Sequence, residues 1–238
     1  MSQEDPDSKR LERTVWQPDG VGFVELVEVF GDDLTVVNAA RVSFDKESTA
    51  MTEADQRLIR YLATHEHVSP FFHPQVRLRI KMPIFVAREW FRSTVGTARN
   101  EVSRRYVDSV PECWIPGVDD LRERDARVKQ GSKATAVAGA AGLAERVAEQ
   151  MRGAVAFYEE LLAAGVAPEV ARAVLPQSMY TEFIETSSLA AVARICHLRL
   201  GAGAQREIQS YAGALSSLMA EAFPVSWAAL RPSLDKSA

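Results

Sequence analysis

Five arginines gather within a short stretch of this 238-residue chain. They are Arg88, Arg92, Arg99, Arg104 and Arg105. A guanidinium group makes paired hydrogen bonds to phosphate or carboxylate oxygens, so such a cluster is suited to a small anionic ligand. The alternative is a solvated, charged helix surface. The net charge of −4 disfavours nucleic acid as the ligand, and we therefore expect a small phosphorylated molecule.

Histidines form a second candidate site, because His65, His67 and His73 lie within nine residues of one another. Imidazoles are common ligands of zinc and iron. The spacing fits no closed tetrahedral site, however, and no cysteine or carboxylate lies in an obvious fourth position. The pattern predicts no metal and favours polar residues at a helix end or in a ligand pocket.

Other common chemistries leave no convincing pattern. The glycine pairs at 20–22 and 201–203 lack the remaining glycines of a dinucleotide-binding loop. Neither Cys113 nor Cys196 is flanked by a convincing base, so both are more typical of core or wall positions than of nucleophiles. Nothing in the sequence marks a triad around Ser103.

The arginine cluster also carries a resemblance. The stretch at 90–107 (WFRSTVGTARNEVSRRYV) resembles the signature region of the flavin-dependent thymidylate synthases. Blocks similar to those of the family occur in the expected order: NAARVSFDK at 38–46, HEHVSPFFH at 65–73, MPIFVAREWFR at 82–92, NEVSRRY at 100–106, ARAVLPQSMYTEF at 171–183 and HLRLGAGAQREIQSYA at 197–212. Six ordered blocks make coincidence an implausible explanation.

The resemblance implies an α+β (α/β) fold in which a mixed sheet is packed with helices. It also implies a homotetramer that binds FAD where subunits meet. Members of the family methylate C5 of a uracil nucleotide, typically converting dUMP to dTMP. Methylenetetrahydrofolate supplies the carbon and NADPH supplies reducing equivalents through the flavin. No enzyme cysteine attacks the pyrimidine, which agrees with the unconvincing thiols.

The family motif also suggests which residues hold the nucleotide. The expected set is Ser103 and Arg199, as the catalytic candidates, together with Glu89, Glu101, Arg104, Arg105 and Arg172. By resemblance, Arg105 faces the phosphate, and Arg172 and Arg199 reach the uracil carbonyl edge. Fixed cations at these oxygens would stabilise the charge that builds up in the ring when C5 reacts.

A second set matches positions that bind the flavin. Its members are Ser43, His67, Ser69, Arg92, Ser93, Val95, Ser188 and Arg194. The chain departs from the family pattern in three places. Ser93-Thr94 replaces His-Arg, with one additional residue before Asn100; Glu89 replaces a glutamine; and an Asn-x-Arg pair becomes Ser188-Leu189-Ala190.

These departures affect the flavin and the sugar more than the nucleotide-holding set. A subclass that includes phage enzymes and the uridylate methylase of polyoxin biosynthesis also departs from the strict signature. The changes leave UMP open as a substrate beside dUMP, since sugar selectivity depends on contacts at the 2′ position. The alternative function is an inactive paralogue that binds nucleotides as a scaffold or regulator.

Composition agrees with a globular enzyme. Hydrophobic residues make up 47 % and charged residues 25 %, which are ordinary values for a soluble domain. Two cysteines are too few for a secreted disulfide framework, and no apolar run is long enough to span a membrane. We therefore expect a cytoplasmic protein that binds neither membranes nor nucleic acid.

The elements that position these residues follow from hydrophobic periodicity. Residues 23–30 read as a strand, 34–44 as a short apolar element and 76–82 as a half-buried strand. Thr52 and Asp55 form an N-terminal helix cap, and Pro83 opens another helix. Further helices are expected at about 143–164 with Gly165 after it, from Pro168 to before Pro176, at 186–198 and at 204–223. The apolar stripe of the first consists of Val147, Met151, Ala154, Tyr158 and Leu161, and the inward positions of the last are Ile208, Tyr211, Leu215, Leu218 and Met219.

The domain organisation is simple. Residues 1–20 are expected to form a flexible arm, and 21–232 a single domain with an insertion or mobile lid at about 117–142. Strands cluster early and helices late, which favours the α+β class over regular βαβ alternation.

Overall fold

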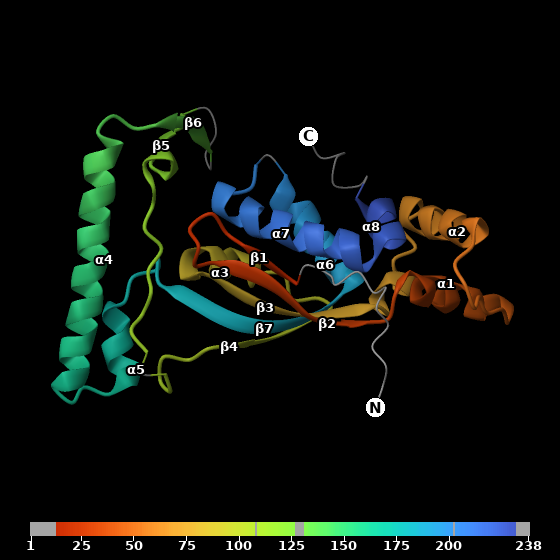
Figure 1. The fold of residues 1–238 in the computed structure, drawn as a ribbon, viewed down its shortest axis with the longest axis horizontal. Helices are drawn as coiled ribbons and strands as arrows, with labels where there is room; N and C mark the ends of the chain where they lie inside the picture. Colours follow the sequence, from red (N-terminus) through yellow and green to blue (C-terminus); the bar gives the residue numbers. More distant parts are fainter. Residues whose placement is uncertain (1–12, 108, 127–130, 202, 232–238) are drawn as a thin grey trace, which may run out of the picture.

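A five-stranded antiparallel sheet forms the centre of the molecule (Figure 1). The computed structural model describes residues 13–107, 109–126, 131–201 and 203–231. The strand order is β1 (Thr14–Trp16), β2 (Phe23–Phe30), β3 (Gln75–Pro83), β7 (Tyr180–Ser188) and β4 (Thr97–Glu101). The α+β class is thus confirmed, whereas the described strands of this sheet pair without the parallel neighbours that a mixed sheet contains.

Helices cover one face of the sheet and extend it at both ends. On the covered face lie α3 (Ile84–Trp90), α6 (Leu189–Leu200), α7 (Arg206–Ala222) and α8 (Pro224–Leu230) (Figure 1). One end carries α1 (Asp33–Arg41), η1 (Val42–Phe44), α2 (Glu53–Thr64) and η2 (Ser69–Phe72). The other end carries η3 (Val118–Asp120), β5 (Arg122–Arg124), β6 (Ser132–Ala136), α4 (Ala140–Ala163), α5 (Pro168–Ala171) and η4 (Arg172–Val174).

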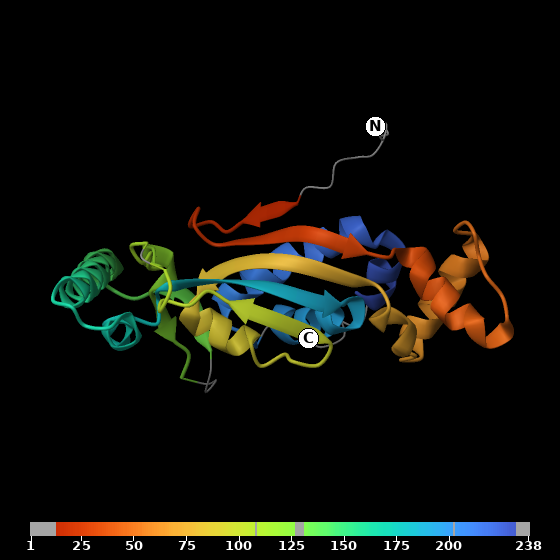
Figure 2. The same ribbon diagram turned by 90° about the horizontal axis from the view of Figure 1, so that it is seen from below.

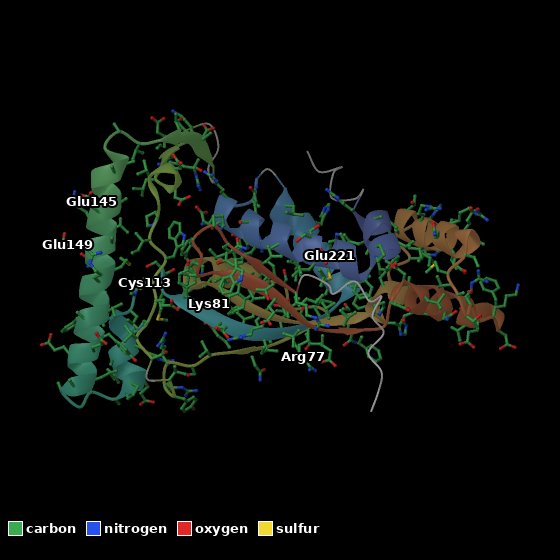
Figure 3. All side chains as sticks on the ribbon, viewed as in Figure 1. Arg77, Lys81, Cys113, Glu145, Glu149 and Glu221 are labelled. Atoms are coloured by element: carbon green, nitrogen blue, oxygen red, sulfur yellow. The ribbon has the colours of Figure 1, made fainter. Side chains whose placement is uncertain are left out.

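The alternation in β3 determines which face of the sheet is the core. Val76, Leu78, Ile80 and Met82 are buried beneath the helices. The intervening cations lie on the open face, which Figure 2 shows without helices in front of it. Arg77 projects from this face in Figure 3 and pairs with Glu28, 2.6 Å away. The predicted half-buried strand is confirmed.

Several local predictions are confirmed to the residue. Thr52 Oγ1 accepts a hydrogen bond from the Asp55 amide at 3.3 Å, and the Asp55 carboxylate accepts one from the Thr52 amide at 3.0 Å. This reciprocal cap begins α2. The five positions predicted to face inward from the last long helix are all buried in α7: Ile208, Tyr211, Leu215, Leu218 and Met219.

One predicted boundary was wrong, and two segments take forms that the sequence did not specify. The helix expected from residue 186 begins at Leu189, because residues 186–188 complete β7. The segment 117–142 holds η3, the two-stranded β5–β6 sheet and the first turn of α4. Residues 34–44 contain helix α1 with the turn η1 after it.

The ends of the chain fall partly outside the described residues. Most of the expected N-terminal arm lies there, as do residues 127–130 of the insertion and the end of the domain at 232. Within the expected arm, Thr14–Trp16 pairs with β2 as an edge strand. Over the described ranges, no helix combines the length and the apolar character needed to cross a membrane.

Candidate active site

Strand β4 lies between the two sets of predicted site residues. The loop before it (residues 91–96) carries flavin candidates, and the loop after it (residues 102–106) carries nucleotide candidates. Gly96 enters β4 with φ of +74°, and a Cβ at this position would lie 2.9 Å from Ser188 Oγ. Only glycine meets both demands without strain. The strand therefore starts at a fixed point against the N-terminus of α6.

The loop after β4 borders a cavity of about 560 Å³. Four predicted nucleotide residues line it: Glu101, Ser103, Arg104 and Arg172. Glu101 ends β4, and Ser103 and Arg104 lie in the loop after it. Arg172 belongs to η4, which contacts α4. Sequence positions about 70 residues apart thus meet around a space large enough for a small ligand.

Arg105 stands beside this cavity in an exposed position. Its Nε donates a hydrogen bond to Ser103 Oγ at 3.3 Å, and its guanidinium lies over the Tyr106 ring, 5.0 Å from the centroid. Most of its donors face solvent, as expected of a cation that receives an anionic group from outside.

A second cavity of about 500 Å³ adjoins the first on the open face of the sheet. Both cavities are lined by Glu101, Arg104, Tyr180 and Thr181, and the second adds Lys81 and Glu112. Thr181 Oγ1 donates a hydrogen bond to Glu101 at 2.6 Å. Sequence analysis missed Tyr180, Thr181 and Lys81 as site residues, although Lys81 was visible as an outward-facing cation of the alternating strand.

Tyr180, which lines both cavities, and the two cysteine thiols stay protonated at neutral pH. Burial, together with the hydrogen bond that Tyr180 Oη donates to Asp19 at 2.5 Å, raises the pKa of the tyrosine. Burial likewise raises the pKa of the Cys113 and Cys196 thiols. A thiolate nucleophile is therefore disfavoured at both cysteines, in agreement with the sequence analysis.

Arg199 and Glu89, both predicted nucleotide residues, form a separate group. Arg199 Nη1 pairs with the Glu89 carboxylate, and Nη2 donates to the Glu89 carbonyl oxygen at 2.8 Å. Arg199 Nε is buried and has no hydrogen-bond partner in the described part of the chain. The cavity lined by Ser103 does not include Arg199, so the two catalytic candidates are not brought together within it.

Most flavin candidates gather where the loop before β4 meets α6. Arg194 donates a hydrogen bond to the Val95 carbonyl oxygen, and the Ser188 amide donates to the Gly96 carbonyl oxygen at 3.0 Å. Ser188 Oγ also caps α6 by accepting from the Ala191 amide at 3.2 Å. Ser93 is buried in the same loop, whereas Arg92 is exposed.

The remaining flavin candidates come from elements earlier in the sequence, which pack at the same end of the sheet as the N-terminus of α6. Ser43 is in η1. His67 lies just before η2 and Ser69 is the first residue of η2, and both are exposed. η2 lies against the loop before β4, because Phe72 is 3.2 Å from the position that a Gly96 Cβ would take. The residues of the loop before β4 and of η2 therefore face a common region.

The donor chemistry of these residues fits FAD. Arg92 and Arg194 supply guanidinium groups, and Ser69 and Ser188 supply hydroxyls. This is the kind of set that binds a diphosphate. The histidines have other contacts, since His65 stacks on Tyr61 with centroids 4.1 Å apart. Among the described residues no group of three or more histidine, cysteine or carboxylate side chains is placed to hold a metal ion.

Comparisons with known proteins assign the family. Residues 25–225 match the family described as "Thymidylate synthase complementing protein". The flavin-dependent thymidylate synthase of Thermus thermophilus is 40 % identical over 218 residues, covering 91 % of this chain and 78 % of the relative. That of Thermotoga neapolitana is 40 % identical over 203 residues, covering 85 % and 88 %. The chain belongs to the flavin-dependent thymidylate synthase family.

Solved structures agree with this assignment. The UMP/dUMP methylase PolB from Streptomyces cacaoi, bound with 5-Br dUMP, is 30 % identical and superposes with a TM-score of 0.78. The superposition covers 88 % of this chain and 94 % of PolB. PolB bound with 5-Br UMP gives a TM-score of 0.79, covering 90 % and 96 %. This member of the flavin-dependent thymidylate synthase family therefore shares its fold with a methylase of uracil nucleotides.

Proposed function

We propose that this enzyme transfers a one-carbon unit to C5 of a uracil nucleotide and reduces it there to a methyl group, converting dUMP to dTMP. The observation that carries the proposal is the cavity in which Glu101, Ser103, Arg104 and Arg172 converge, in a chain of this family. The cavity offers cations for a monophosphate and polar groups for a sugar or base.

The proposed roles combine the family resemblance with the placement of the residues. Arg105, exposed beside the cavity, binds the phosphate, and Ser103 is held at its edge. Arg172 and Arg199 stabilise negative charge on the uracil carbonyl oxygens. Arg199 is suited to this because Glu89 fixes its orientation before substrate arrives. The second set of residues would hold FAD, which would pass on reducing equivalents from NADPH, and methylenetetrahydrofolate would supply the carbon.

A homotetramer with sites between subunits completes the proposal. Within one chain, Ser103 and Arg172 line a cavity that does not include Arg199. A second copy that brings its Arg199 and Glu89 to this cavity would assemble the full nucleotide set. The exposed apolar side chains of α4, among them Leu143 and Phe157, favour association of this kind.

The substrate range is proposed to include UMP beside dUMP. The methylase PolB, which shares this fold, has been crystallised with both 5-Br dUMP and 5-Br UMP. Glu89 and Ser93 differ from the family pattern at positions next to the expected nucleotide and flavin, so they are where sugar selectivity would be altered. We expect dUMP to be the better substrate.

Turnover and absorbance test the proposal together. The purified protein should be yellow, and NADPH should bleach it in the absence of oxygen. It should then form methylated nucleotide from dUMP and methylenetetrahydrofolate. Arg172→Ala should lower kcat/KM for dUMP about a hundredfold, as expected for the loss of a charge-assisted contact to substrate. Arg57→Ala, which removes an exposed arginine of α2, is the matched control and should leave kcat/KM unchanged.

A colourless protein that gains thermal stability with dUMP but forms no product would contradict the proposal. That outcome would instead support the inactive, nucleotide-binding paralogue. Steeply salt-dependent binding of DNA or RNA would point to a nucleic-acid-binding protein.

A further inference from the structure

A fully buried carboxylate lies beneath β4 and has no role in the site described above. Glu185 in β7 is 0 % exposed and stands directly across from Arg99 in β4. Arg99 Nε and Nη2 both donate to one of its oxygens, at 2.8 and 2.6 Å. Trp90 Nε1 donates to the same oxygen at 3.0 Å, and Ser187 Oγ donates to the other at 3.0 Å. The carboxylate is thus bound on both oxygens.

Arg99 is fixed in orientation as firmly as its partner. Its guanidinium lies over the Phe91 ring at 4.5 Å and near the Phe183 ring at 5.6 Å. Aromatic rings and two hydrogen bonds to one carboxylate oxygen restrict a guanidinium to one plane. The remaining contact of Nη2 is with the carbonyl oxygen of Ser93, at 3.3 Å. Arg99 therefore connects a strand of the sheet to the loop before β4.

The same loop is held at two more points, and the first residue of β4 at a third. Thr97 Oγ1 and Ser187 Oγ share a hydrogen bond of 2.9 Å. Val95 and Gly96 are held through their carbonyl oxygens by α6, as described above. The segment is therefore held by Arg99 and Ser187 on one side and by α6 and its cap on the other. It carries three flavin candidates, Arg92, Ser93 and Val95.

Stability alone does not account for such a pair. Desolvating two charges offsets their attraction, so a buried ion pair can often be replaced by apolar residues without loss of stability. What a satisfied polar network does provide is a single arrangement of the groups that it connects. Here the connected group is a loop that departs from the family pattern and has one additional residue before Asn100.

We propose that Arg99 and Glu185 are positioning residues that hold the loop at 91–96 in its flavin-binding conformation. The proposal rests on the proposed function, because it assumes that this loop binds FAD. Glu185 orients Arg99, and Arg99 in turn fixes the Ser93 carbonyl oxygen. Neither side chain needs to touch the cofactor.

The test removes both charges while keeping the volume of the two side chains. The double variant Arg99→Met/Glu185→Met is compared with Arg122→Met/Glu207→Met, which removes another ion pair of low exposure, 3.0 Å long, between β5 and α7. Three quantities are measured on the full chain. They are the urea midpoint, amide hydrogen exchange of peptides covering 91–98 without added flavin, and the dissociation constant for FAD.

In the Arg99/Glu185 variant we expect exchange at 91–98 to be about tenfold faster and FAD affinity about tenfold weaker, the size expected for losing one charge-assisted hydrogen bond. The Arg122/Glu207 variant should leave both quantities unchanged, even where its urea midpoint shifts by as much. If the double variant fails to fold, Glu185→Gln, which keeps the shape of the side chain, is measured in its place and should show the same changes to a smaller degree.

Unchanged exchange at 91–98 in the Arg99/Glu185 variant would overturn the proposal, as would FAD affinities that follow the urea midpoint across both pairs. Failure of the proposed function is recognised separately. If the wild-type chain does not bind FAD, the cofactor assignment is wrong, while hydrogen exchange still decides whether the pair orders the loop.

Discussion

Helices α7 and α4 are both long and amphipathic, yet their surroundings differ completely. All five positions of α7 that periodicity predicted as inward-facing are buried. Of the 24 residues in α4, which lie wholly within the described part of the chain, Ala140 and Tyr158 are the buried ones. Of its predicted apolar stripe (Val147, Met151, Ala154, Tyr158 and Leu161), therefore, a single member is buried. Periodicity identifies the apolar side of a helix but not what covers it.

The reason lies in what each helix packs on. α7 contacts β1, β2, α3, α6 and α8, so its apolar side faces the main core. α4 stands at the end of the molecule, where it contacts α5, η3 and η4 (Figure 1). Glu145 and Glu149 point away from the rest of the chain in Figure 3. The difference separates a region that builds the fold from a region available for association.

The largest expected difference between α7 and α4 is in the free energy of unfolding that is lost when a leucine is truncated in each helix. Leu215→Ala should lower the free energy of unfolding by about 3–4 kcal/mol, because a fully buried leucine leaves a cavity. Leu161→Ala in α4, where the side chain is half-buried, should cost about 1 kcal/mol. Urea unfolding measures both. Equal losses that grow with protein concentration would show that α4 is covered in an assembly.

Two glycines give a second contrast. A Cβ at Gly22 would lie 2.1 Å from the buried Tyr211 hydroxyl of α7, so Gly22→Ala must displace that ring and should cost roughly 2 kcal/mol. A Cβ at Gly153 in α4 meets nothing within 4 Å. Gly153→Ala should therefore raise the free energy of unfolding by about 0.5–1 kcal/mol through helix propensity. Thermal unfolding of the two variants should shift in opposite directions.

Helix α2, at the end of the molecule opposite α4, should make the free energy of unfolding depend on pH. Hydrogen bonds, chiefly from the Thr52 hydroxyl and also from Ser48 and Arg41, lower the pKa of Asp55 from 3.8 to about 2. A lowered pKa contributes stability that is complete above the unfolded value and is lost as pH falls through the folded one. We expect roughly 2 kcal/mol to disappear between pH 5 and pH 2. Asp55→Asn, measured by urea unfolding over this range, should lack that part of the slope.

The smallest expected effect links α4 to activity. Tyr158 is buried, and α4 contacts η4, which carries Arg172. Tyr158→Ala should let η4 shift and should raise KM for dUMP about threefold to tenfold with little change in kcat, because in the proposed function Arg172 contacts substrate in the ground state as well. Steady-state kinetics measure the two constants. Glu159→Ala, which truncates an exposed charged neighbour on the same helix, should leave KM unchanged.

Much of the fold was predictable where information is local. The cap at Thr52 and the alternation of β3 involve residues within a few positions of one another, and both predictions were confirmed. β4 was missed because none of its residues is buried, and β7 because most of its buried positions are polar, among them Thr181, Glu185 and Ser187. Glu185 is buried in β7 because Arg99, 86 residues away, pairs with it, and no local pattern shows such a partner.

The site divides in the same way. The residues themselves could be named from motifs, because each block is contiguous in sequence. Their grouping could not, since the Arg199–Glu89 pair joins positions 110 residues apart and Arg172 reaches the Ser103 cavity from a different element. Whether these residues bind nucleotide and flavin as expected stays a prediction.

The lengths of the strands have a consequence for behaviour in concentrated solution. The inner strands β2, β3 and β7 have eight or nine residues, whereas the two edge strands, β1 and β4, have three and five. An exposed edge strand offers unpaired backbone groups to another chain, and a short edge strand offers few such groups. The sheet thus presents little template for runaway strand addition, so crowding should favour discrete oligomers over fibres.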